Sequence, residues 1–216
     1  MPSAHPTRSD QSARAASGPA DRRRTPGRDI AVIAVFAGIT AALGFLPAFY
    51  TPISPSPITA QSFGTILAGA ILGARRGGLS QLLFMALVAL GLPLLAGGRG
   101  GVGVFASATV GFLVAYVVVP FLIGWATERV GAPYRFVPGL LINAAFGIVV
   151  MYLFGAVGMM AVMHLSVPAA ALAVTPFIIG DSIKVVLATA TAVAVHKSYP
   201  GLLPLRGRLG RDAASA

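Results

Sequence analysis

The chain has 216 residues, of which 56% are hydrophobic and only 10% are charged, and its mean hydropathy is +0.83. Soluble domains carry about 25% charged residues, so this composition excludes an ordinary water-soluble fold and predicts a single membrane domain. The absence of cysteine excludes disulfides and thiolate chemistry. The net charge of +10 lies in the tails and between apolar runs, which is typical of charges that set membrane topology and not of nucleic-acid binding.

The chain divides into a membrane domain and two basic tails. Residues 1–28 are rich in arginine, serine, alanine and proline, so we expect a disordered cytoplasmic tail that cannot bury enough apolar surface to fold. Residues 29–198 are expected to form the membrane domain. Residues 199–216 are expected to form a short basic tail, also cytoplasmic.

The apolar runs predict an all-α integral membrane protein with six transmembrane helices. The charge-free stretch 30–74 is long enough for two spans of about 20 residues each, and the prolines clustered in 47–57 predict a loop between them. Charged or glycine-rich interruptions between apolar runs delimit the other four predicted helices. The six predicted helices cover residues 30–48, 58–74, 77–95, 104–126, 136–164 and 169–197.

The distribution of basic residues predicts that both ends of the chain are cytoplasmic. With six helices, the predicted outer loops contain only Arg99 as a basic residue, and all other arginines and lysines outside the helices fall on the inner side. This asymmetry agrees with the positive-inside rule. Five or seven helices would not give this asymmetry between inner and outer segments. We therefore expect a multi-pass protein of the cell membrane with membrane lipid around it.

Small residues recur at four-residue spacing in two predicted helices. Gly69 with Gly73, and Ala37 with Ala41, can let helix backbones approach closely where no hydrophobic effect drives association. For Ala37 and Ala41 two interpretations stay open: contact with a partner subunit, or packing inside the chain.

Asp181 and Lys184 are the only acidic or basic residues other than histidine between 136 and 196. A charge at bilayer depth costs at least ~2.5–3.5 kcal/mol, so such residues usually face a cavity or a partner. Their spacing places both on one helix face. They either neutralise each other as a local ion pair or bind a ligand. As a donor and an acceptor they suit a small ligand that carries an acid and amide-like N–H groups.

Further polar residues can complete such a site. Thr59, Gln61, Asn143 and Tyr152 lie within or beside predicted helices, and each either lines the cavity or satisfies a neighbouring backbone. The loop 97–103 contains five glycines around Arg99 and is expected to be a mobile lid. The arginine either meets an anionic ligand or is simply exposed.

No motif indicates an enzyme. The glycine-rich loop lacks the G-x-x-x-x-G-K-[ST] pattern of nucleotide sites. The histidines are scattered at positions 5, 164 and 196, so no metal cluster is predicted. No serine lies in a G-x-S-x-G elbow. A different class nevertheless stays open, namely a membrane enzyme or proton-relay subunit in which Asp181 and Lys184 transfer protons.

Three stretches of the sequence resemble the BioY family, the biotin-binding S components of energy-coupling factor (ECF) vitamin transporters. They are residues 57–64 (PITAQSFG), the stretch from 77 through the glycine loop to 103, and residues 176–184 (PFIIGDSIK), which match a PF-x-x-GD-x-IK signature. Residues 152–155 (YLFG) are a weaker match. Residues 107–112 differ, because they keep only the threonine and one glycine of the family's G-P-T-G-G-Y pattern.

The resemblance implies a six-helix S-component fold that binds biotin from outside. Matched by position, it implies Asp181 and Lys184 as the main binding residues, followed by Gln61, Arg99 and Tyr152. It also implies a membrane-spanning T component and two cytoplasmic ATPases as partners, with residues 37–41 as the docking stripe, in a prokaryotic plasma membrane. An S component for another small vitamin stays open, as does a homo-oligomer.

Overall fold

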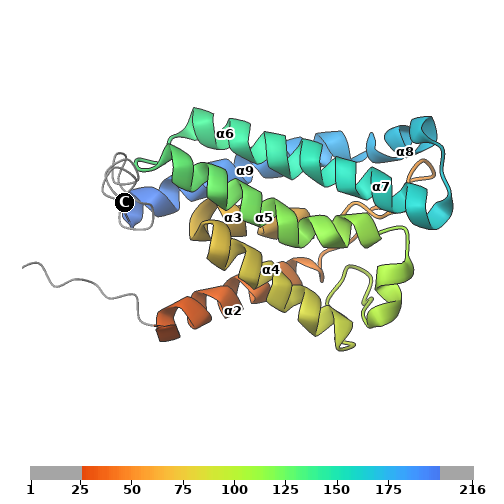
Figure 1. The fold of residues 1–216 in the computed structure, drawn as a ribbon, viewed down its shortest axis with the longest axis horizontal. Coiled ribbons are helices and arrows are strands. Elements are labelled where there is room, and N and C mark those ends of the chain that lie inside the picture. Colours follow the sequence, from red (N-terminus) through yellow and green to blue (C-terminus); the bar gives the residue numbers. More distant parts are fainter. Residues whose placement is uncertain (1–25, 200–216) are drawn as a thin grey trace, which may run out of the picture.

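The computed structural model describes residues 26–199 (Figure 1). The predicted tails therefore lie outside the described residues, except that the first helix already begins at Pro26. Proline suits this position because the first turn of a helix does not use its backbone N–H. The described elements are α2 (Pro26–Leu43), α3 (Gln61–Leu72), α4 (Ala74–Ala89), the 3-10 helix η1 (Val102–Ala106), α5 (Val110–Val130), α6 (Phe136–Ala144), the π-helix η2 (Ala145–Val150), α7 (Met151–Met163), α8 (Val167–Val174) and α9 (Phe177–Ser198).

Each predicted helix is found, with different boundaries. Within the described chain, three helical stretches are long and apolar enough to cross a membrane: α5, the continuous α6–η2–α7, and α9. The predicted helix 169–197 is in fact two helices, because proline at 176 lacks an N–H and the chain turns between α8 and α9. Similarly, the predicted helix 104–126 begins as the separate turn η1 before α5.

The short helix α3 lies at the centre of the bundle. It contacts α2, α4, α5 and α9, and 10 of its 12 residues are buried. This short helix is therefore packed against neighbours on most of its surface. At Gly69 an added Cβ would meet the backbone of Pro120 on α5, which confirms the predicted close approach. Gly73 has a different role, because its φ of +80° forms the break between α3 and α4.

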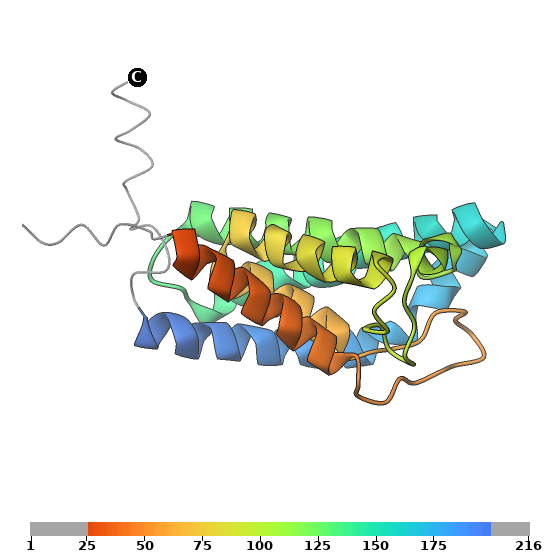
Figure 2. The ribbon, with the colours of Figure 1, turned by 90° about the horizontal axis from the view of Figure 1, so that it is seen from below.

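Both described ends of the chain lie at the same end of the bundle (Figures 1 and 2). The start of α2 and the end of α9 are there, while α8 and the long loops 44–60 and 90–109 lie at the opposite end. The view in Figure 2 shows α2 crossing the face of the bundle beside α4, with which it is in contact. The first turns of α9, which carry Asp181 and Lys184, therefore lie toward the loop end.

Candidate ligand-binding site

The two charged residues of α9 form a buried ion pair. The Lys184 Nζ atom lies 2.8 Å from Asp181 Oδ1. The exposed fractions of the two side chains are 16% for the lysine and 3% for the aspartate. Two charges removed from water in this way require further hydrogen bonds to offset their desolvation.

The start of α3 provides those hydrogen bonds. Lys184 Nζ donates to the Thr59 backbone oxygen at 2.6 Å and to Ser62 Oγ at 3.1 Å. The Ser62 hydroxyl in turn donates to Asp181 Oδ1 at 3.1 Å. Thr59 and Ser62 are more than 110 residues from α9 in the sequence, so the pair is completed only when α3 packs against α9.

Tyr152 of α7 holds the other carboxylate oxygen. Its hydroxyl donates to Asp181 Oδ2 at 3.0 Å, and its ring lies 6.2 Å from the ring of Phe177. Asp181 therefore accepts three hydrogen bonds from three different elements. A carboxylate has about four acceptor positions, so one stays open.

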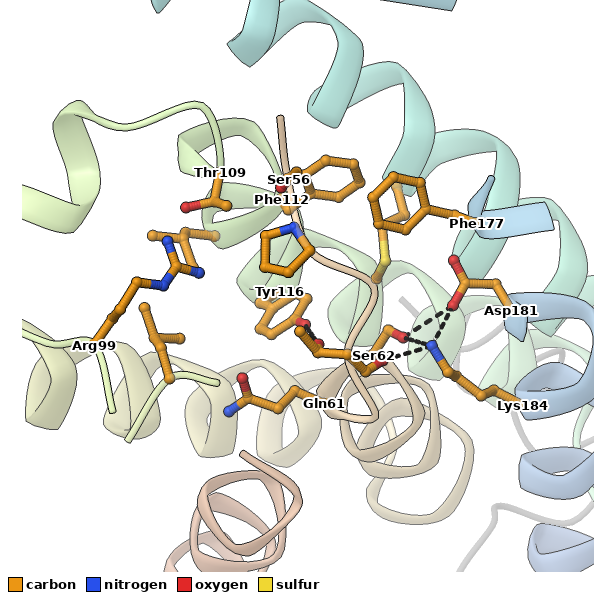
Figure 3. A pocket seen from close by; sticks show the side chains of 15 residues that line it. Ser56, Gln61, Ser62, Arg99, Thr109, Phe112, Tyr116, Phe177, Asp181 and Lys184 are labelled. Atoms are coloured by element: carbon orange, nitrogen blue, oxygen red, sulfur yellow. Dashed lines mark hydrogen bonds and ion pairs between the residues drawn. The ribbon is translucent and has the colours of Figure 1, made fainter. Parts of the chain in front are cut away.

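These residues line a small cavity (Figure 3). Its volume is about 40 Å³. Its polar lining consists of Ser56, Thr59, Gln61, Ser62, Arg99, Thr109, Tyr116, Asp181 and Lys184, and its apolar lining of Pro57, Leu95, Phe112, Leu113, Met151 and Phe177. Drug-sized ligands occupy pockets of roughly 300–1,000 Å³, so the walls must move apart before such a molecule can enter.

Arg99 lies on the opposite side of the cavity from the ion pair, as Figure 3 shows. Its Nε donates to the backbone oxygen of Ala96 at 3.3 Å. No carboxylate of the described residues lies within ion-pair distance of its guanidinium. Arginine has five N–H donors. Because one is used by Ala96, four remain that can donate hydrogen bonds to an anionic group.

Gln61 contributes to the cavity wall, but its amide is bonded to the protein. Its Nε2 donates to the backbone oxygens of Thr40 and Leu94, and its Oε1 accepts the N–H of Ala96. Of the predicted site residues, the structure thus brings five together: Thr59, Gln61, Arg99, Asp181 and Lys184 line the cavity. Tyr152 joins them through its bond to the aspartate.

Asn143 does not lie at this cavity. Its Nδ2 donates to Thr189 Oγ1 at 2.9 Å and to the Tyr134 hydroxyl at 3.3 Å, in a separate polar cluster. The Tyr134 ring stacks on His196, which contacts the backbone oxygen of Ala70. Burial raises the pKa of Tyr134 to about 12, although its bond with the asparagine acts in the opposite direction. The asparagine therefore helps to hold α6 against α9.

Ala37 also lies where a partner cannot reach it. It is 2% exposed and belongs to the buried core, because this face of α2 packs against the rest of the bundle. Ala41 is half-buried and packs against the same core. For Ala37 the interpretation that favours packing inside the chain therefore agrees with the structure. Ala34, Gly38 and Ala42 are exposed small residues that recur at four-residue spacing on α2.

The sequence did not point to four polar residues of the cavity lining, Ser56, Ser62, Thr109 and Tyr116. Ser62 bridges both charges, and Tyr116, whose hydroxyl lies 3.5 Å from Thr59 Oγ1, closes the cavity from α5. Ser62 falls inside the recognised stretch 57–64, one residue after Gln61, so its place in that motif was an available signal. Tyr116 lies in an apolar helix with no such motif, and no sequence feature distinguishes it from a core tyrosine.

A helical membrane bundle with a charged, hydrogen-bonded cluster facing an internal cavity defines a class: membrane proteins that hold a small polar ligand between their helices. In the described residues there is no group of three or more histidine, aspartate or glutamate side chains placed to bind a metal ion.

The chain belongs to the BioY family, whose sequence profile matches residues 14–201. It is 44% identical over 186 residues to a biotin transporter BioY from Rhizobium etli, covering 83% of this chain and 98% of that one. It is 39% identical over 173 residues to a probable biotin transporter BioY from Bacillus subtilis, covering 79% and 91%. A crystal structure of the S component for biotin from an ECF-type ABC transporter superposes with a TM-score of 0.78 at 28% identity, covering 82% of this chain and 95% of that one.

Proposed function

We propose that this chain is a biotin-binding S component that mediates biotin uptake across a prokaryotic plasma membrane. The observation that carries the proposal is the buried cluster of Asp181, Lys184, Ser62 and Tyr152 against a cavity, in a chain of the BioY family. The names of its relatives support biotin as the ligand. The relatives are transporters, which supports uptake and not catalysis.

The free hydrogen-bonding positions suggest how biotin lies in the cavity. The three ammonium donors of Lys184 are already used by Thr59, Ser62 and Asp181, whereas Asp181 has one acceptor position open. Among the described residues, the Arg99 guanidinium has four unused donors and no acidic partner. We therefore place one ureido N–H group of the ligand at Asp181, and the ligand's carboxylate at Arg99 instead of Lys184.

Room for the ligand exists beside the small cavity. A groove of about 370 Å³ shares Thr59 and Lys184 with the cavity, and its other lining residues are Leu46, Pro47, Phe49, Ile58, Ala60 and Gly180. Its lining is almost entirely apolar. A shift of the segment around Thr59 would join the groove to the cavity and would give biotin's apolar chain a matching surface.

We further propose six membrane spans with both ends in the cytoplasm. Of the eight arginines and lysines in the described residues, six lie at the end of the bundle that holds the start of α2 and the end of α9, namely Arg28, Arg75, Arg76, Arg129, Arg135 and Lys197. Arg99 lies at the other end. This distribution supports an orientation in which the cavity opens to the outside.

The family implies a membrane-spanning T component and two cytoplasmic ATPases as partners. In that arrangement, rearrangement of the partner subunits driven by ATP tips the loaded bundle toward the cytoplasm. Since Ala37 is buried, we propose that the partner docks on the exposed side of α2, where Ala34, Gly38 and Ala42 lie. Small residues there would let a partner helix approach closely.

The proposal is tested by equilibrium binding of labelled biotin to the purified protein in detergent. We expect saturable binding that Asp181→Asn and Lys184→Met both weaken, because each substitution breaks a charge-assisted contact of about 1.5–3 kcal/mol. Binding of a different vitamin and not of biotin would support another S component. Absence of vitamin binding, together with proton transfer that depends on both residues, would support a proton-relay subunit instead.

A further inference from the structure

The loop 90–101, called the lid loop below, has few bonds that attach it to the bundle. It carries Leu95 and Arg99, which line the cavity. These two residues pair with each other through backbone hydrogen bonds of 3.0 and 3.2 Å. At its end, the N–H of Gly101 donates to the Val88 oxygen at 2.7 Å. These bonds shape the loop and tie it to α4, but they do not attach its cavity-facing part to α3.

Gln61 makes that attachment. Its Oε1 accepts the N–H of Ala96 at 3.1 Å, and its Nε2 donates to the oxygen of Leu94 at 3.0 Å. The second N–H of the same Nε2 donates to the Thr40 oxygen of α2 at 3.1 Å. One side chain thus connects the lid loop to both α2 and α3. The residue is 2% exposed, so water does not compete for these bonds.

The junction is also closely packed. A Cβ added at Gly44, where the chain leaves α2, would collide with the Leu94 oxygen and come within 2.9 Å of the Gln61 Nε2 atom. The Gln61 amide has two N–H donors, and both are used. A ligand cannot take a hydrogen bond from this amide unless the lid loop or α2 first gives one up.

We propose that Gln61 is a positioning residue that latches the lid loop over the cavity and keeps Arg99 facing the ion pair. The inference rests on the proposed biotin site and deepens it. The latch acts on how long the loop stays closed, and therefore on the rate at which bound ligand leaves. Breaking two loop bonds of about 0.5–1.5 kcal/mol each corresponds to a dissociation rate about ten-fold higher or more.

Gln81 offers a matched control. It is also a completely buried glutamine. Its Nε2 donates to Thr40 Oγ1 at 2.9 Å and its Oε1 accepts from Thr65 Oγ1 at 3.4 Å. Both partners belong to α2 and α3, and its recorded side-chain bonds do not reach the lid loop. Replacing it removes a buried amide from the same region while the latch stays in place.

The experiment compares Gln61→Met with Gln81→Met in the full-length protein. Two quantities are measured: hydrogen exchange of the peptide that covers residues 94–99, and the dissociation rate of labelled biotin. We expect Gln61→Met to speed exchange in this peptide selectively and to raise the dissociation rate about ten-fold or more. Gln81→Met should leave both within about two-fold of wild type, because the lid loop keeps its bonds.

Each outcome decides the matter. Unchanged exchange and dissociation in Gln61→Met would overturn the latch, and so would equal changes in Gln81→Met, which would indicate a general loss of stability. If Gln61→Met selectively speeds exchange in the peptide 94–99 but the wild-type protein does not bind biotin, the latch is supported and the proposed function is refuted. If Gln61→Met does not fold, Gln61→Glu serves instead, since it keeps an oxygen for the Ala96 N–H but loses amide donors.

Discussion

Replacement of Arg99 by glutamine tests the orientation of the ligand. If the guanidinium receives the biotin carboxylate, Arg99→Gln removes a charge-assisted contact and should raise the Kd for biotin. Such contacts contribute about 1.5–3 kcal/mol, which corresponds to a Kd about 10- to 150-fold higher. Arg99 is partly exposed, so we expect the lower part of this range at physiological salt, where exposed charges are screened.

The decisive measurement uses a second ligand, biotin with its carboxylate converted to a neutral amide. Binding of both ligands is measured to wild type, Arg99→Gln and Lys184→Met. Wild type should prefer biotin by about the factor that Arg99→Gln loses, and Arg99→Gln should bind the two ligands almost equally. This double-substitution cycle isolates the contact between carboxylate and guanidinium from any effect on folding.

Arg129→Gln provides the control for a general change in charge. Arg129 lies over the ring of Trp125, 4.6 Å from its centre, on the last turn of α5 and far from the cavity. It should not alter the preference for biotin. The reasoning is refuted if Arg99→Gln still discriminates between the ligands while Lys184→Met does not, because the carboxylate would then lie at the lysine.

Three further predictions concern residues outside the ligand contacts. Asn143→Leu should leave the Kd for biotin within about two-fold of wild type, because the asparagine lies in a separate cluster. A large loss of affinity would instead indicate that Asn143 belongs to the binding site. Gly158→Ala should lower the melting temperature in detergent by about 3–10 °C, because its Cβ would collide with the backbone of Gly111, whereas Gly103→Ala, with open space around it, should not. Gly38→Leu should abolish copurification with the T component and keep biotin binding; retained copurification would exclude this face of α2.

Much of the fold follows from where charges and prolines interrupt apolar runs. Loops must contain them because lipid does not solvate a charge or a free backbone group. The break at Pro176 shows the limit: the residues on both sides are equally apolar, and only the missing N–H marks the turn between α8 and α9. Hydropathy could not separate one long helix from two.

The same limit applies to the direction in which each helix faces. In a water-soluble helix the buried side is the apolar side, but in lipid both sides are apolar. The four-residue spacing of Ala37 and Ala41 therefore indicated close packing without saying against what. In the structure Ala37 faces the core, whereas Gly38 is exposed. Which side of α2 packs inward depends on its contacts with α3 and α4.

The charged residues of the site were predictable, and their hydrogen-bond partners were not. Two charges within an apolar stretch are rare enough to identify a site by themselves. The 57–64 motif pointed to Gln61, which lines the cavity, but the sequence does not reveal that its amide is bonded to the lid loop. Such roles depend on contacts between segments more than 30 residues apart.

The arrangement of the ion pair favours a binding role over a stabilising one. A buried pair can often be replaced by apolar residues with no loss of stability, so stability alone does not explain why Asp181 and Lys184 lie here. The lysine is saturated by Thr59, Ser62 and Asp181, and its hydrogen bond to Oδ1 helps to orient the carboxylate. Tyr152 holds the other oxygen. The aspartate is thereby presented to the cavity as a fixed acceptor with one position open, which suits the recognition of one N–H group of a ligand.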